Sequence, residues 1–445
     1  MQEIDASLIE KAVYNLCKEA NIRLPLNVYN KIRSASQENE QNQFILKNAQ
    51  IAFERQRPLC QDTGQVIVFA DIGQNVHICG DNITDAINKG VSKCYKDNFY
   101  RKSIVKNALY DRNNSQDNTP AVIHYNIIDA DYINIKIMIK GGGSENVTGT
   151  KMLNPTLTNE QIYKEIMDII KAAGKNACPP LFIGIGFGQT AENAILLSKK
   201  AILEGKENSQ LCKFLNENID IGLKTPILDV KELSSSTHIA SMPLGITIMC
   251  HSNRYHSCVI RNNKIEYTTE LSVPETTTVH FEGKKLYCND IEGLKSISSG
   301  EKILLNGKVY TARDQAHKRL VKMIKNGETL PIDIKNTILF YAGPCPSTPN
   351  EISGPIGPTT SKRMDAFAIE LYESGIIATI GKGTRSESIL KYLEQSNKKY
   401  FEMQGGIASY IASCIKSCKI TAFEDLGAEA IYELEVENLP VICVI

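Results

Sequence analysis

The segment YINIKIMIK, residues 132–140, has isoleucine at every second position from 133 to 139. Alternation of this kind is typical of a β-strand, which points successive side chains to opposite faces of a sheet. The strand runs directly into the glycine-rich GGGSEN, and from about Thr158 to Gly174 isoleucines recur at helical spacing. The strand-like run LFIGIGFG and a helix that opens at Thr190 come next. Strands and helices in this order predict a mixed α/β fold.

The chain is long for a single hydrophobic core, since it has 445 residues. The polar stretch from about 261 to 280, RNNKIEYTTELSVPETTTVH, is the best candidate for a linker. After it come short strands with turns, a helix that follows GPTTS, and the strand IIATI. We therefore predict a larger α+β domain over 1–268 and a smaller β/α domain over 269–445.

Three short patterns give further local predictions. Ser7 and Glu10 have the spacing of a capping box at the start of a helix. Cys414 and Cys418 lie four residues apart, which predicts one wall of a buried helix. The glycines of GIGFG, residues 184–188, are evenly spaced, whereas dinucleotide binding requires G-x-G-x-x-G. Close backbone packing is therefore favoured over phosphate binding for this segment.

Composition excludes several classes of function. The 50 basic and 50 acidic residues give a net charge of zero, which provides no attraction for nucleic acid or an anionic membrane. No apolar run approaches the roughly 20 residues that cross a bilayer. The acidic N-terminus, MQEIDASLIE, resembles neither a secretory signal nor a transit peptide, so a cytoplasmic location is expected. The thirteen cysteines should then be thiols, and none has the CxxC spacing of a zinc ribbon.

Several motifs suit the binding of an anion. KGGGSEN exposes backbone N–H groups after a strand, although a flexible hairpin turn explains it equally well. GPTTSKRMD places hydroxyls and Arg363 at a helix N-terminus, where capping alone does not call for cations. Arg313 follows the strand-like KVYT, and Cys250 ends an apolar run that begins after His238. From spacing alone these patterns predict an anion-binding enzyme with exposed cysteines.

Eight motifs follow one another along the chain: RPLCQDTGQ, DNTPAVIHY, KGGGSEN, ACPP, MPLGITIMCHSNR, TARDQAHKR, GPTTSKRMDAF and GGIASYIA. Their combination resembles the iron–sulfur class I fumarate hydratases and the related L(+)-tartrate dehydratases. The likeness covers nearly the whole chain, and the α and β parts that are separate subunits in some members are joined here. It implies a cluster-binding N-terminal domain, a swivelling-type C-terminal domain and an active site between them.

The resemblance implies that Cys60, Cys178 and Cys250 hold a [4Fe–4S] cluster. Three thiolates for four irons leave one iron open, so that it can act as a Lewis acid. This accounts for a cysteine beside Gln61 and Asp62 in RPLCQDTGQ. Cys345 is the rival ligand, and it ranks below the other three.

The implied reaction is the reversible hydration of fumarate to L-malate, a step of the tricarboxylic acid cycle. Thr359 is the expected base, and Asp62 is the expected acid near the hydroxyl. The alternative within the family is L(+)-tartrate dehydratase, which gives oxaloacetate, and a homodimer is the expected assembly. The residues expected to bind the dicarboxylate are Gln61, Arg101, Gly142, His238, Arg313, Arg363 and Lys382.

Two readings from other classes are less well supported. A nucleotide-binding oxidoreductase that uses GIGFG would need an acidic residue at the end of the next strand, and no convincing one is present. An iron-sensing RNA-binding protein would need a basic stripe, which the neutral composition does not favour.

Overall fold

The computed structural model describes residues 2–37, 39–220 and 223–445. The chain divides into two compact units, which we call unit 1 and unit 2. Unit 1 comprises Met1–Gln56 and Asp62–Thr276, and unit 2 comprises Arg57–Gln61 and Thr277–Ile445. The predicted mixed α/β architecture in two parts is confirmed. The predicted boundary at residue 268 stays a prediction. Within the described ranges, no helix has the length and apolar character needed to cross a membrane.

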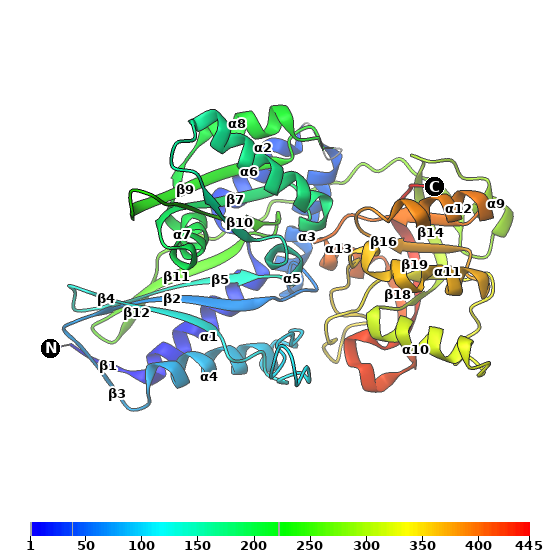
Figure 1. Ribbon diagram of the computed structural model, residues 1–445. Coiled ribbons are helices and arrows are strands. Elements are labelled where there is room, and N and C mark those ends of the chain that lie inside the picture. The colour runs from blue at the N-terminus through cyan, green and yellow to red at the C-terminus, as the bar shows by residue number, and fades with distance from the viewer. Residues whose placement is uncertain (1, 38, 221–222) are drawn as a thin grey trace. The chain divides into compact units, whose positions relative to one another are not determined.

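The first sheet of unit 1 contains the alternating strand that the sequence predicts. Its order is β12-β11-β5-β2-β4, and all neighbours are antiparallel except β2 and β4. Two longer helices, α1 and α4, pack together below this sheet (Figure 1). The bounds are β2 Gln65–Gly73, β4 Val122–Ile128, β5 Ile133–Lys140, β11 Arg254–Arg261, β12 Lys264–Tyr267, α1 Ala6–Ile22 and α4 Ile83–Asp97, with β1 Gln2–Asp5 and β3 Val76–Cys79 forming a small parallel pair.

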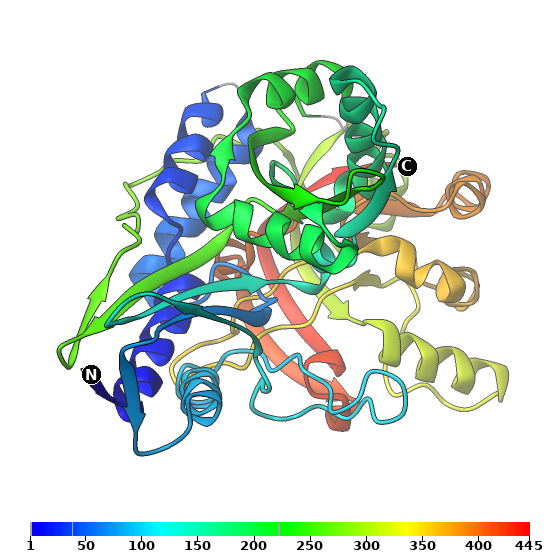
Figure 2. The same ribbon diagram turned by 60° about the vertical axis from the view of Figure 1, so that its left-hand side comes forward.

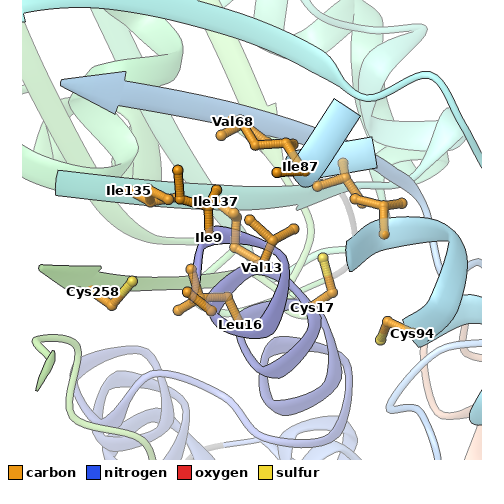
Figure 3. Packing of buried hydrophobic residues seen from close by; sticks show 14 of the residues in the cluster. Ile9, Val13, Leu16, Cys17, Val68, Ile87, Cys94, Ile135, Ile137 and Cys258 are labelled. Carbon is orange, nitrogen blue, oxygen red and sulfur yellow. The ribbon is translucent and has the colours of Figure 1, made fainter. Parts of the chain in front are cut away.

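The core of this layer explains the isoleucine alternation. Ile135 and Ile137 of β5 are fully buried and face Ile9 and Val13 of α1 (Figure 3). The same cluster contains Cys258, a buried thiol. Since each large aliphatic side chain contributes about 1.5–3 kcal/mol on burial, this alternation fixes which face of β5 lies against the helices.

The second sheet of unit 1 has the order β6-β10-β7-β9-β8. The glycines of strand β7 allow a helix to pack closely against it, as the sequence predicts. A Cβ at Gly184 would lie 2.1 Å from the Ser198 oxygen, and one at Gly186 would lie 2.1 Å from that of Ala194, so helix α7 sits directly on β7. The bounds in this part are β6 Gly149–Leu153, β7 Leu181–Gln189, β8 Lys206–Glu207, β9 Ile227–Thr237, β10 Met242–Met249, α2 Leu26–Ser36, α3 Glu40–Arg55, α5 Gly142–Glu145, α6 Asn159–Ala173, η1 Gly174–Ala177, α7 Ala191–Glu204 and α8 Ser209–Asn218.

Unit 2 is built on one sheet of order β13-β14-β15-β16-β17-β19-β18. An additional pairing of β14 with β19 closes the five strands from β14 to β19, without β18, into a ring. Helices α10, α11 and α12 stack beside one another along this ring (Figure 2). The bounds are β13 Lys284–Tyr287, β14 Lys302–Thr311, β15 Ile338–Phe340, β16 Ala378–Gly381, β17 Lys399–Glu402, β18 Ile415–Ala422, β19 Ile431–Cys443, α9 Ile291–Lys295, α10 Asp314–Lys325, η2 Ser361–Met364, α11 Asp365–Glu373, α12 Glu387–Ser396, α13 Ala408–Ser413 and η3 Glu424–Glu429.

Two local predictions are wrong. Helix α1 is capped by Asp5, whose Oδ1 accepts the Ser7 N–H at 2.7 Å, so the helix begins before the predicted capping box. Cys414 caps the end of α13, and Cys418 lies in strand β18, opposite Leu434 of β19. There, pairing with β19 overrides the helical spacing.

Candidate functional site

Asp62 lies in unit 1 in the loop before β2, and four groups surround it. Its Oδ2 accepts the Gly142 N–H at 2.9 Å, and its Oδ1 accepts the Gly64 N–H at 3.1 Å. Arg101 Nη2 lies 3.8 Å from Oδ1, and Arg254 Nη2 donates to the Asp62 carbonyl oxygen at 2.8 Å. Three predicted site residues, Asp62, Arg101 and Gly142, are therefore brought together.

The charge state of Asp62 follows from these contacts. Burial alone would raise the pKa of this carboxyl, but the Arg101 and Arg254 charges and the Gly142 and Gly64 N–H groups outweigh it and lower the pKa below the ordinary 3.8. Asp62 is therefore ionised at neutral pH. It can accept a proton before it donates one.

Replacing Asp62 with asparagine should destabilise the protein by about 2 kcal/mol at pH 7, because hydrogen bonds to an ionised group are lost. A carboxyl with a lowered folded pKa stabilises above its unfolded pKa, and the stabilisation disappears as pH falls through the folded pKa. The difference in free energy of unfolding between the wild-type protein and the variant should therefore become smaller below about pH 4. Urea unfolding between pH 3 and 7 measures it. A gap that stays constant over this range would contradict the assigned ionisation.

The KGGGSEN motif forms a short helical turn rather than a hairpin. Strands β5 and β6, which flank it, belong to different sheets, and α5 occupies the glycine loop. A Cβ at Gly141 would lie 3.0 Å from Asp62 Oδ2, so the bare backbone lets the carboxylate approach. The motif's lysine, Lys140, is buried and lies 3.3 Å from Glu145, and its burial lowers its pKa to about 8 although the Glu145 charge raises it.

Cys178 and Cys250 lie at the same end of two neighbouring strands, β7 and β10, in the second sheet of unit 1. Strands β7 and β10 are antiparallel with Phe182 opposite Met249, so the residues before β7 and after β10 are neighbours. The ring Nδ1 of His251 lies 3.1 Å from the Cys178 carbonyl oxygen, which joins the two segments. Both cysteines are half-buried, whereas Cys60 is buried.

Cys60 belongs to the segment Arg57–Gln61, which is grouped with unit 2. Among the described residues, no three or more His, Cys, Asp or Glu side chains are gathered closely enough to hold a metal ion. The chemistry of the predicted donor set nevertheless suits iron and sulfide, since three thiols are soft ligands.

The segment Arg57–Gln61 is anchored within unit 2 by side chains. Arg57 Nη2 donates to the Pro346 oxygen at 2.7 Å, and Ser409 Oγ donates to the Pro58 oxygen at 2.9 Å. The thiol of Cys345, the rival ligand, donates to the Gln61 oxygen at 3.2 Å. This contact gives Cys345 a role in holding the segment.

In unit 2, hydrogen bonds join Thr359 to the side chain of Arg363 and to the backbone of Lys382. Arg363 Nη2 donates to Thr359 Oγ1 at 3.0 Å and to Asp314 Oδ2 at 2.6 Å. The Lys382 N–H donates to the Thr359 oxygen at 3.1 Å. Thr360, the N-cap residue of η2, makes no side-chain capping bond, so simple capping by this hydroxyl does not explain the GPTTS run.

Two further predicted residues have other partners, and two neighbours of the site were missed. Arg313 Nη2 lies 3.7 Å from Glu429, and His238 is exposed in a turn where its Nδ1 accepts the Ala240 N–H. The sequence analysis assigned no role to Arg254 or Asp314. Arg254 is buried and begins β11, but in the sequence it follows the polar residues HSN and gives no signal of its burial. Asp314 has no signal beyond its place beside Arg313.

Family models match the chain in two adjoining stretches. The model described as fumarate hydratase (Fumerase) covers residues 10–259, more than half of the chain, and the model described as Fumarase C-terminus covers 259–445. The chain belongs to the fumarate hydratase family. The predicted family resemblance is thus confirmed, and so is the expectation of an enzyme of the lyase class.

Named relatives of this fumarate hydratase family member include two kinds of protein. The aerobic class I fumarate hydratase of Escherichia coli (strain K12) is 29% identical over 437 residues, which cover 89% of this chain and 79% of that protein. A "Putative L(+)-tartrate dehydratase subunit alpha" of Methanocaldococcus jannaschii is 35% identical over 55% of this chain and 95% of its own length. The corresponding "subunit beta" is 38% identical over 33% and 77%. One chain therefore matches both subunit types.

Proposed function

We propose that this protein reversibly hydrates fumarate to L-malate. The observation that carries the proposal is the hydrogen bond from Arg363 to Thr359, next to the backbone of Lys382. A hydroxyl that accepts a hydrogen bond from a guanidinium suits a proton transfer beside a carboxylate. Family membership supplies the substrate class.

Binding of the dicarboxylate would rest on the cations and amides named above. Arg101, Arg313, Arg363 and Lys382 would pair with the two carboxylates, because arginine matches a carboxylate with two parallel N–H groups. The remaining expected contacts, from Gln61, Gly142 and His238, are hydrogen bonds.

The proton transfers would be divided between two residues. In the hydration direction Asp62, which is ionised, would take a proton from the attacking water, and the Thr359 hydroxyl would give one to the substrate carbon. In the reverse direction Thr359 would take the proton from carbon, and Asp62 would return its proton to the departing hydroxyl. Arg363 would stabilise the threonine oxygen while it carries charge.

We further propose that Cys60, Cys178 and Cys250 hold a [4Fe–4S] cluster. When bound, the cluster would supply an open iron that polarises the hydroxyl oxygen of the substrate. We also propose a homodimer in the cytoplasm, where reduced thiols are the rule. Light scattering of the purified protein measures its mass.

L(+)-tartrate is the second candidate substrate. The relatives named as tartrate dehydratase subunits are 35% and 38% identical, against 29% for the Escherichia coli fumarate hydratase. Both reactions remove water from a hydroxylated four-carbon diacid, so the same cations would serve either one.

The deciding measurement is turnover of fumarate, L-malate and L(+)-tartrate by anaerobically purified protein reconstituted with iron and sulfide. We expect fast interconversion of fumarate and L-malate that is lost on exposure to air. Preference for tartrate would keep the residue assignments and change the substrate. If a cluster is bound and none of the three is turned over, the roles of Thr359 and Asp62 are wrong.

A further inference from the structure

The segment with Thr359 and Arg363 and the loop with Lys382 are joined by their backbones. Thr360 and Lys382 form a parallel bridge, and the Ser361 N–H donates to the Lys382 oxygen at 2.9 Å. The Thr359 N–H in turn donates to the Tyr341 oxygen at 2.6 Å. These bonds set the spacing of three residues of the proposed site, Thr359, Arg363 and Lys382.

The side chains of Tyr400 and Ser361 form a hydrogen-bond relay between these two segments. The Tyr400 hydroxyl on β17 donates to the Gly383 oxygen at 2.6 Å and lies 2.9 Å from Ser361 Oγ. A phenol has a single proton, and since Gly383 receives it, Ser361 must donate to Tyr400. Both side chains are fully buried. A Cβ at Gly381 would lie 2.0 Å from Ser361 Oγ, so this glycine makes room for the relay.

The far end of the Lys382 loop is held by Arg385. Its side chain is fully buried, and its guanidinium carbon lies 5.5 Å from the ring centre of Tyr341 and 5.4 Å from that of Tyr400. Its Nε donates to Asp365 Oδ1 at 2.8 Å, directly after η2, which carries Arg363. The loop is therefore fixed at Gly383 and again at Arg385.

We propose that Tyr400 is a positioning residue that links the Thr359–Arg363 segment to the Lys382 loop through its single hydroxyl. Each bond is short and buried. The inference deepens the proposed function, on which its catalytic consequence rests. The backbone bonds between the two segments remain when the hydroxyl is removed, so we expect a change in their relative geometry and not their separation. A shift of about 1 Å between reacting groups can cost about a hundredfold in rate, so such a change should be measurable.

Tyr400→Phe tests the proposal, because it removes the hydroxyl and keeps the ring beside Arg385. Tyr372→Phe is the matched control: Tyr372 is also fully buried in unit 2, and its hydroxyl contacts Thr379 and the Lys399 oxygen. Its connection to the Lys382 loop is indirect, through Thr379, whose hydroxyl also accepts from Arg385 at 3.1 Å. Both variants lose one buried hydrogen-bonding hydroxyl, so their melting temperatures should fall similarly.

We expect Tyr400→Phe to lower kcat for fumarate about 10- to 100-fold, with a smaller change in KM, while Tyr372→Phe keeps wild-type kinetics. Amide hydrogen exchange of peptides from residues 357–364 and 381–386 should rise in Tyr400→Phe alone. Equal kinetics and equal exchange in the two variants would overturn the proposal and leave the proposed function standing. If the wild-type protein does not turn over fumarate, the proposed function is wrong. The comparison of amide hydrogen exchange between the two variants would still decide the role of Tyr400.

Discussion

Replacing Cys178 with alanine is expected to remove bound iron and to reduce turnover of fumarate by more than a hundredfold. Loss of a residue that only supports a metal ligand costs about 10- to 100-fold, so loss of a ligand itself should cost more. Cys250→Ala should give the same result, because the two cysteines lie next to the same ends of the neighbouring strands β7 and β10. Iron and sulfide content, visible absorption and turnover of anaerobically reconstituted protein measure the effect.

Cys258→Ala is the matched control for these variants. Cys258 lies eight residues after Cys250, but it is fully buried in the apolar core, where burial raises the pKa of its thiol to about 12. A buried thiol of this kind is inert. Its removal should lower stability by about 1 kcal/mol and leave iron content unchanged. Wild-type iron content in Cys178→Ala would show that Cys178 is not a ligand.

Replacing Arg363 with alanine is expected to abolish turnover, with a fall of about 100- to 1,000-fold in kcat, while bound iron stays at the wild-type level. The change removes the donor to Thr359 and the partner of Asp314 at the same time. Arg363→Lys should recover only part of the activity, since an ammonium keeps the charge and loses the planar fork. Steady-state kinetics with fumarate and L-malate measure all three proteins.

Arg319→Ala provides the control for charge and for folding. Arg319 lies on α10 and pairs with Asp425, and 42% of its side chain is exposed. Exposed pairs contribute about 0–1 kcal/mol, so this variant should have wild-type kinetics. Normal hydration of fumarate by Arg363→Ala would remove Arg363 from the site and would leave the hydrogen bond to Thr359 without a catalytic role.

The elements that the sequence predicted well are those in which side-chain periodicity reports burial directly. The isoleucine alternation gave strand β5, and the capped isoleucine pattern gave α6, where Thr158 and Gln161 form a capping box. The prediction failed for Cys414 and Cys418, since pairing with a distant strand, β19, decided the structure there. Contacts between residues far apart in sequence leave no local pattern.

The same limit applies to the site. Motifs led to Asp62 and Thr359 through a family resemblance, but no spacing in the sequence places Arg254 against the Asp62 backbone. Tyr400 is 41 residues from Thr359 along the numbering, and only the ring of strands in unit 2 brings its hydroxyl to Ser361. Sequence motifs can thus identify candidate reacting groups, whereas the residues that position these groups are found only from the folded structure.

The closed ring of strands in unit 2 also bears on solubility. Among the described strands, β13 and β18 are the outermost of that sheet, and each pairs on one side only. Unpaired strand edges template aggregation, and natural proteins discourage it with lysines. β13 begins with Lys284 and Lys285, and β18 carries Lys416 and Lys419. Both remaining edges therefore repel a second copy of themselves, which favours recovery of dispersed chains when the protein is refolded at high concentration.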